Sequence, residues 1–303
     1  MLDAIIWFLS SVALAPYHLF LALTNPSMWL NWSDKEALVR FIYFGGSKEL
    51  FFVVFVTFLV ITALGVFWRR SILWSCVRGL EAFANTVGRI VAWAGLIMVL
   101  QQVMIVFLQR IFRVAAIELG PLGTAFTRDL SWWSEELKLY NAMIVCLCVT
   151  YTFVQGSHVR VDLFYASASH RAKRVIDMLG ALFFMMPVVI ITYLYAWFFM
   201  WRHLVVPNPS ATSALDRMLM QSRVLRWNVE TIGFSPNGFD AYFLFKVLIV
   251  AFCVMVLLQA ASTFWRAFLE FVEGEDSTDK YLDRDSTGDV AEDAVHEAHS
   301  GSA

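Results

Sequence analysis

The apolar parts of this sequence contain few of the residue types that carry out chemistry. Histidine occurs there once, as His18, close to the helix-breaking Pro16. A haem-binding membrane subunit needs two axial ligands at matched depth on facing helices, so a single histidine does not predict a haem site. The sequence also lacks the His-Glu-x-x-His, Gly-x-Ser-x-Gly and glycine-rich phosphate-binding motifs of common enzymes. We therefore predict no catalytic residue, no cofactor and no metal site, and expect that the chain is not an enzyme.

Charged side chains, which usually mark ion pathways and proton relays in membranes, are also missing from the apolar stretches. These stretches contain neutral amides instead, among them Gln101, Gln102 and Gln259. An amide in hydrocarbon usually hydrogen-bonds to a neighbouring helix, so we expect helix–helix contacts at these positions. A substrate-facing role is the alternative. The four cysteines are not spaced as metal ligands and are predicted to be packing residues.

The elements that hold these residues are predicted to be transmembrane helices. Of the 303 residues, 59% are hydrophobic and 16% are charged. In a soluble domain about 45–50% of the residues are apolar and about 25% are charged. Stretches without Asp, Glu, Lys or Arg cover residues 4–23, 50–68, 90–109, 139–157, 178–201 and 247–265. Each is close to the roughly 20 residues that a helix needs to cross a bilayer core, and none alternates as the strands of a membrane β-barrel do. The expected fold class is an all-α integral membrane protein with about six transmembrane helices.

The first and fifth stretches each contain a proline. Residues 13–15 (Ala-Leu-Ala) look like a signal-peptide cleavage site, but Pro16 follows directly and no positive segment precedes the stretch. We therefore expect a retained helix that is kinked at Pro16. Pro187 is expected to bend the fifth helix.

Two further segments have apolar residues at helical spacing with charges on the remaining faces. Residues 73–89 and 211–232 are predicted to be interfacial amphipathic helices. For residues 73–89, an extension of the helix at 90–109 is the alternative.

Charge divides the chain into a basic body and an acidic end. Residues 270–303 carry eleven acidic side chains against Lys280 and Arg284, with many small polar residues, and are predicted to form a disordered tail. Lysine and arginine are densest in the loops at 69–78 and 157–174. Because basic loops stay in the cytoplasm, we expect both termini there.

Several short motifs resemble those of a transporter family. Residues 156–163 (Gly-Ser-His-Val-Arg-Val-Asp-Leu) resemble the G-x-H-x-R-V-D-L element in the small membrane subunit of tripartite ATP-independent periplasmic (TRAP) transporters. Supporting elements follow the family's order at residues 109–112, 132–137, 171–177, 245–246 and 257–259. The resemblance spans residues 80–270 and is to the branch associated with mannitol, chloroaromatic and keto-acid systems.

The resemblance implies an organisation and a mechanism. The family's core has four helices, so residues 76–269 would form that core, residues 1–75 an extension with two more helices, and residues 270–303 the tail. Residues 113–131 would be an insertion. In such systems a periplasmic solute-binding protein captures a carboxylate-bearing solute, and a large membrane subunit moves it by a sodium-driven elevator motion. The small subunit widens the stationary scaffold, so sodium and solute sites are expected in the other chain.

The resemblance also implies the partners: the large TRAP membrane subunit, the periplasmic solute-binding protein and membrane lipids, with no nucleic acid. The expected location is a bacterial inner membrane. The candidates for the partner interface are Trp132, Trp133, Glu135, Glu136, His158, Arg160, Asp162, Gln101, Gln102 and Gln259. A simpler interpretation of the loop residues among them is an aromatic belt with charges that mark helix ends. An autonomous channel or carrier and a redox-complex membrane anchor remain the alternative functions.

Overall fold

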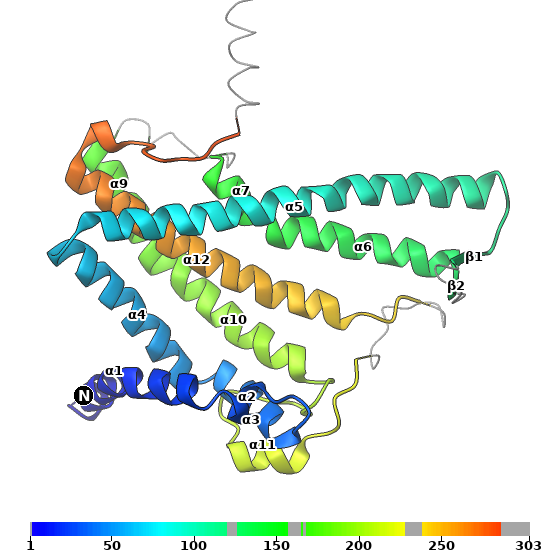
Figure 1. The fold of residues 1–303 in the computed structure, drawn as a ribbon, viewed down its shortest axis with the longest axis horizontal. Helices are drawn as coiled ribbons and strands as arrows, with labels where there is room; N and C mark the ends of the chain where they lie inside the picture. Colours follow the sequence, from blue (N-terminus) through cyan, green and yellow to red (C-terminus); the bar gives the residue numbers. More distant parts are fainter. Residues whose placement is uncertain (1, 120–125, 157–164, 166–167, 228–237, 286–303) are drawn as a thin grey trace, which may run out of the picture.

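The computed structural model describes residues 2–119, 126–156, 165, 168–227 and 238–285 (Figure 1). Six helical segments are long and apolar enough to cross a membrane: Asp3–Thr24, Lys48–Phe67, Arg70–Arg110, Leu130–Val154, His170–Trp201 and Phe243–Glu273. The prediction of a mostly helical chain with six such helices is confirmed.

The elements follow one another along the chain. The helices are α1 (Leu2–Thr24), α2 (Ser27–Leu30), α3 (Lys35–Gly45), α4 (Lys48–Phe67), α5 (Arg70–Arg110), α6 (Leu130–Leu147), α7 (Val149–Val154), α9 (His170–Leu179), α10 (Met186–Trp201), α11 (Leu215–Gln221) and α12 (Phe243–Glu273). A π-helical segment, η2 (Gly180–Met185), joins α9 to α10, and a 3₁₀ turn, η3 (Glu275–Ser277), follows α12.

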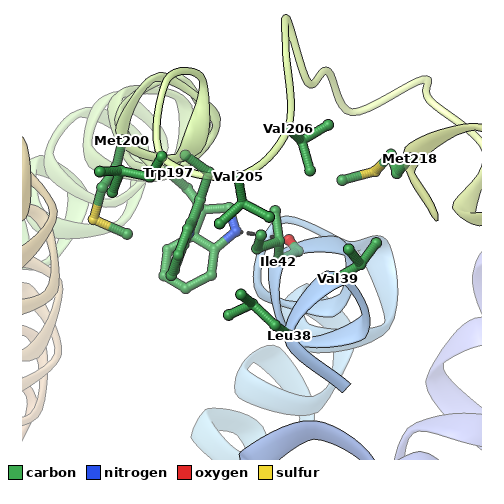
Figure 2. Packing of buried hydrophobic residues seen from close by; sticks show 10 residues of the cluster. Leu38, Val39, Ile42, Trp197, Met200, Val205, Val206 and Met218 are labelled. Atoms are coloured by element: carbon green, nitrogen blue, oxygen red, sulfur yellow. Dashed lines mark hydrogen bonds between the residues drawn. The ribbon is translucent and has the colours of Figure 1, made fainter. Parts of the chain in front are cut away.

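Helix α3 lies between the first two apolar stretches, where no helix was predicted. The Asp34 carboxylate caps its start by accepting a hydrogen bond from the Glu36 N–H at 3.1 Å. Figure 2 shows how α3 packs on α10: the Trp197 indole N–H donates to the Ile42 carbonyl at 2.8 Å. Leu38, Val39 and Ile42 are buried against α10 and α11. The apolar residues of α3 thus attach the N-terminal segment to the rest of the protein.

Helix α5 continues without a break through residues 73–110. The interpretation of residues 73–89 as a separate interfacial helix is therefore wrong, and the alternative, an extension of the next helix, is confirmed. At about 1.5 Å per residue, its 41 residues reach about 60 Å, twice the thickness of a bilayer core. A helix this long is either strongly tilted or projects beyond the core.

Residues 113–131, the expected insertion, contain a β-hairpin. Strands β1 (Ala116–Leu119) and β2 (Phe126–Asp129) are antiparallel, with Ala116 opposite Asp129, so the described chain is not wholly α-helical. Helix α6 starts directly after β2, nine residues before the predicted start at 139. The polar residues at its start are part of the helix and have partners within the chain. Glu136 contacts α5, and Glu135 contacts the segment before α12.

The fifth membrane helix is longer than expected and irregular. It begins at His170 rather than 178, because the basic segment there is already helical. The π-helical segment η2 ends two residues before Pro187. A local π-bulge is one way in which a helix accommodates a residue without an N–H group. A bend was predicted at Pro187 itself. The irregular segment that the structure shows lies on the N-terminal side of this proline.

Two predictions near the C-terminus are wrong in part. Of residues 211–232, only Leu215–Gln221 are helical, residues 222–227 are not, and 228–232 lie outside the described residues. The disordered tail was predicted to start at 270, but α12 continues to Glu273 and residues 278–285 pack against α5. The reason is that the acidic side chains there have basic and amide partners within the chain. Residues 286–303 lie outside the described part.

Helix α12 connects two regions of the protein in which polar side chains gather. Its first turn and the two residues Phe239 and Asp240 lie beside β2 and the start of α6, a region that we call the hairpin end. Its last two turns lie beside the first half of α5 and beside α9, which we call the charged end (Figure 1).

Candidate functional site

The hairpin end contains several of the residues singled out from sequence. The Asp240 carboxylate accepts a hydrogen bond from the Trp132 indole N–H at 3.2 Å and lies 3.4 Å from the Arg128 guanidinium. The same guanidinium lies over the Trp132 ring, 5.5 Å from its centroid. One residue before Asp240, the Phe239 N–H donates to the Glu135 carboxylate at 2.8 Å. Strand β2, α6 and the segment before α12 are thereby joined by charged and aromatic side chains.

Glu136 faces the other way, toward α5. Its carboxylate accepts hydrogen bonds from the Gln101 amide at 3.1 Å and from the Tyr140 hydroxyl at 3.2 Å. The Gln101 amide also donates to the Trp133 carbonyl at 3.3 Å. The helix–helix contact expected for Gln101 is thus present within this chain, between α5 and α6.

The other candidates are distributed over the protein. Trp133 is half-buried and packs edge-on against Trp132, with ring centroids 5.2 Å apart. Gln102 is exposed on α5, whereas Gln259 is buried on α12. His158, Arg160 and Asp162 lie outside the described residues. The hairpin end therefore brings together Trp132, Glu135 and their neighbours, but not the glutamines at 102 and 259.

The charged end contains a buried network of ion pairs that the sequence analysis missed. The Arg266 guanidinium on α12 binds the Glu81 carboxylate on α5 through two contacts of 2.7 and 2.5 Å. It also lies 3.4 Å from the Glu270 carboxylate, which in turn lies 2.7 Å from Nε of Arg174 on α9. The side chain of Glu270 is only 1% exposed, and those of Glu81, Arg266 and Arg174 are 6, 13 and 18% exposed. Three helices are held together by charges that alternate in sign.

Part of this network carried a signal in the sequence. Arg266 and Glu270 are four residues apart, a spacing that places opposite charges side by side on a helix. Glu81 and Asn85 were counted among the polar residues on the remaining faces of the pattern at 73–89, whereas both are buried on α5. The partner of Glu81, Arg266, is 185 residues away in the chain, and no local pattern indicates such a pairing.

The described residues contain no group of three or more His, Cys, Asp or Glu that could hold a metal ion. A hollow of about 320 Å³ lies on α4, and one of about 80 Å³ lies between α1 and α4. Neither hollow is lined by residues of the charged network or of the hairpin end. Both polar clusters join elements of this chain to one another.

The fold and the two clusters define a class of protein: a helical membrane protein with six potential spans, joined by two clusters of polar side chains. Comparison with known protein families, with characterised proteins and with solved structures finds no significant match to this chain.

Proposed function

We propose that this chain is the small, non-catalytic membrane subunit of a sodium-coupled TRAP transporter in a bacterial inner membrane. In this role it scaffolds the large transport subunit, which takes up an organic acid or related solute delivered by a periplasmic binding protein. The single observation that carries the proposal is the series of motifs in the family's order, led by residues 156–163.

The exposure of the membrane helices supports a scaffolding role. In five of the six potential spans, between 6 and 17% of the most apolar window is buried within the chain, and α12 reaches 39%. A carrier that works alone needs polar groups along a path that its own helices enclose. These helices instead turn most of their apolar side chains outward, as suits contact with lipid and with the helices of another subunit.

The motifs also coincide with contacts that hold the scaffold together. The element at 171–177 contributes Arg174 to the charged network, and the element at 132–137 contributes Glu135 and Glu136 to the hairpin end. The element at 245–246 contributes Lys246, which is buried 4.5 Å from the centroid of the Phe199 ring. Residues that resemble the family are therefore used here for packing between helices.

The proposal is tested by purifying the tagged full-length chain from its native membranes in mild detergent, followed by mass spectrometry. We expect stoichiometric recovery of a larger membrane protein with about twelve helices, as the TRAP resemblance implies. Membranes that carry an unrelated tagged protein of similar size are the control. Recovery of this chain alone, stable and homogeneous, would contradict the proposal and favour the autonomous channel or carrier. A haem absorption band in the purified material would favour the redox anchor.

A docking role for Glu135 and Glu136 toward the binding protein is a separate part of this proposal. Charge reversal at both positions is expected to reduce uptake when the binding protein is limiting. Reversal at Lys138, which is exposed on the same helix, is the matched control. Because both carboxylates have partners within the chain, the amount of folded protein is measured in parallel. Unchanged uptake would rule out docking through these residues.

A further inference from the structure

The polar face of the first half of α5 is covered by the chain's own C-terminal segment. Residues 279–285 follow α12 and run along α5, where the residues that face them recur at helical spacing, from Trp74 through Arg78 and Asn85 to Arg89. Tyr281 packs edge-on against Trp74, with centroids 5.6 Å apart, and under the Arg78 guanidinium at 5.2 Å. The C-terminal segment therefore covers part of this face of α5.

Two amide side chains bind the backbone of this segment. The Gln155 amide donates to the Asp283 carbonyl at 3.1 Å and accepts from the Asp285 N–H at 2.9 Å. A carbonyl and an N–H two residues apart are the pair of groups that a neighbouring parallel strand would bind. The Asn85 amide donates to the same Asp283 carbonyl at 2.8 Å, and its own oxygen accepts from Gln155 at 3.2 Å. Asn85 is fully buried, so its contacts are shielded from water on the side of α5, whereas the contact from Gln155 to the Asp283 carbonyl is exposed.

The acidic side chains of the segment are bound as well. The Arg89 guanidinium lies 2.6 Å from the Asp285 carboxylate and 3.1 Å from that of Asp283. The Tyr151 hydroxyl donates a second hydrogen bond to Asp285. In an extended backbone, residues two apart point to the same side, which explains how one guanidinium reaches both carboxylates.

The end of α7 leaves room for this arrangement. Gly156 has φ of +70°, a left-handed conformation that ends the helix directly after Gln155. The Arg284 guanidinium lies 3.6 Å from the place of a Cβ at this glycine. A larger residue here would be strained and would stand beside the bound segment.

We infer that Asn85, Arg89, Tyr151 and Gln155 form a recognition site for an extended, acidic peptide, and that residues 283–285 of the same chain are its ligand. Asn85 and Gln155 bind the main chain of the peptide, which does not depend on its sequence. Arg89 and Tyr151 bind its side chains and so select carboxylates two residues apart. Since only residues 274–282 separate this ligand from the end of α12, its effective concentration at the site is high. The inference does not depend on the transporter function proposed above.

Hydrogen exchange of the full-length protein in detergent or nanodiscs tests the site. The Asp285 amide is expected to exchange at least about threefold faster than in the wild type in two variants: Gln155→Leu, which removes the acceptor of its hydrogen bond, and Arg89→Gln, which removes a partly exposed ion pair. Arg89→Lys retains the cation and is expected to keep most of the protection. Arg110→Gln, an exposed arginine at the far end of α5, is the matched control. Equal exchange in wild type, Arg89→Gln and Gln155→Leu would overturn the inference, as would an equal loss in Arg110→Gln.

Recognition in trans is the second test. A fluorescent peptide of residues 279–285 is added to the full-length Asp283→Asn, Asp285→Asn chain, whose own ligand is weakened. We expect the peptide to bind this variant more tightly than the wild type, where the resident segment competes, and to bind less when Arg89→Gln is added. If the peptide does not bind this variant, the contact is packing within the chain only, and the proposed recognition site is overturned.

Discussion

The four charged side chains of the buried network are the residues whose removal should affect the protein most. Taking a charge out of water is costly unless an opposite charge and further hydrogen bonds compensate it. Arg266 provides both for Glu81, with two contacts between the guanidinium and the carboxylate. Such bidentate pairs are the strongest form of this contact in proteins. The loss of one partner leaves the other buried and uncompensated.

We therefore expect Glu81→Ala to lower the free energy of unfolding by about 3–5 kcal/mol. Denaturant unfolding of the detergent-solubilised chain measures this. The matched control is Glu36→Ala, which removes the partner of Arg40 in an exposed pair four residues apart on α3 and should cost at most about 0.5 kcal/mol. If both variants unfold at the same denaturant concentration, the network does not stabilise the charged end.

Asp285 makes the bound C-terminal segment sensitive to acid. The hydrogen bond from the Tyr151 hydroxyl, followed by that from the Arg89 guanidinium, lowers the pKa of this carboxyl below its ordinary value of 3.8. A lowered pKa in the folded state means that the charged form is favoured there. The contribution of Asp285 is therefore complete above pH 3.8 and is lost as the pH falls through the lowered pKa.

We expect residues 279–285 to remain protected from hydrogen exchange from neutral pH down to about pH 4, and to be released as the pH falls further. Exchange rates are compared with the intrinsic rate of the unfolded peptide at each pH. Asp285→Asn, which cannot ionise, is expected to show weaker protection at neutral pH and a smaller dependence on pH. A wild-type segment that stays equally protected at pH 2 would contradict the role of this carboxylate.

At the scale of the elements, the sequence predicted what depends on local composition. Continuous apolar runs located all six long helices, because crossing a bilayer sets both their length and their apolar character. The limits of the helices were less predictable, since polar residues at the starts of α6 and α9 extend these helices by nine and eight residues. Helix α3 was missed because its apolar residues have their partners on α10, 155 residues away for Ile42 and Trp197.

The candidate sites follow the same rule. Gln101 was found because an amide in an apolar helix needs a partner. Asp240, Glu81 and the acidic residues of the bound segment look in the sequence like ordinary surface charges. Their partners Trp132, Arg266 and Arg89 are more than a hundred residues away. Pairings of this kind depend on the packing of whole helices, which a single sequence does not show.

The contact between α3 and α10 depends on a glycine. At Gly45, the place of a Cβ is already taken by the Trp197 ring, so Gly45→Ala must push α3 away from α10. We expect overpacking to cost about 1–3 kcal/mol in the free energy of unfolding and to increase hydrogen exchange in residues 35–45.

Gly79→Ala is the matched control for this prediction. Gly79 is exposed within α5 and has no atom within 4 Å of the place of a Cβ. Alanine is the better helix former, so this change should stabilise by about 0.5–1 kcal/mol. Similar stabilities of the two alanine variants would show that α3 does not need close contact with Trp197.

At the scale of the whole molecule, the polar contacts gather at two ends that α12 separates. The described charged network and the bound C-terminal segment lie at the charged end, whereas α11 and the hairpin lie away from it (Figure 1). Between the ends, the helices expose large apolar side chains such as Trp93, Leu100 and Ile191. Exposed side chains of this kind are stable only in contact with lipid or with other apolar helices. The two ends are therefore expected to face opposite sides of a membrane.

Thiol labelling tests this arrangement with two matched substitutions. Ser71→Cys lies at the start of α5 at the charged end, and Ser210→Cys lies between α10 and α11; both serines are exposed. Each is introduced alone into a chain whose four native cysteines are replaced by serine or alanine. A maleimide that cannot cross membranes is expected to label Ser71→Cys in inverted vesicles and Ser210→Cys in right-side-out vesicles, because the basic loop at 69–78 favours the cytoplasm. Labelling of both from one side would contradict the membrane arrangement itself. Labelling from opposite sides in the reverse sense would retain the placement of these two positions on opposite sides and invert only the orientation, so the two questions have separate answers in one experiment.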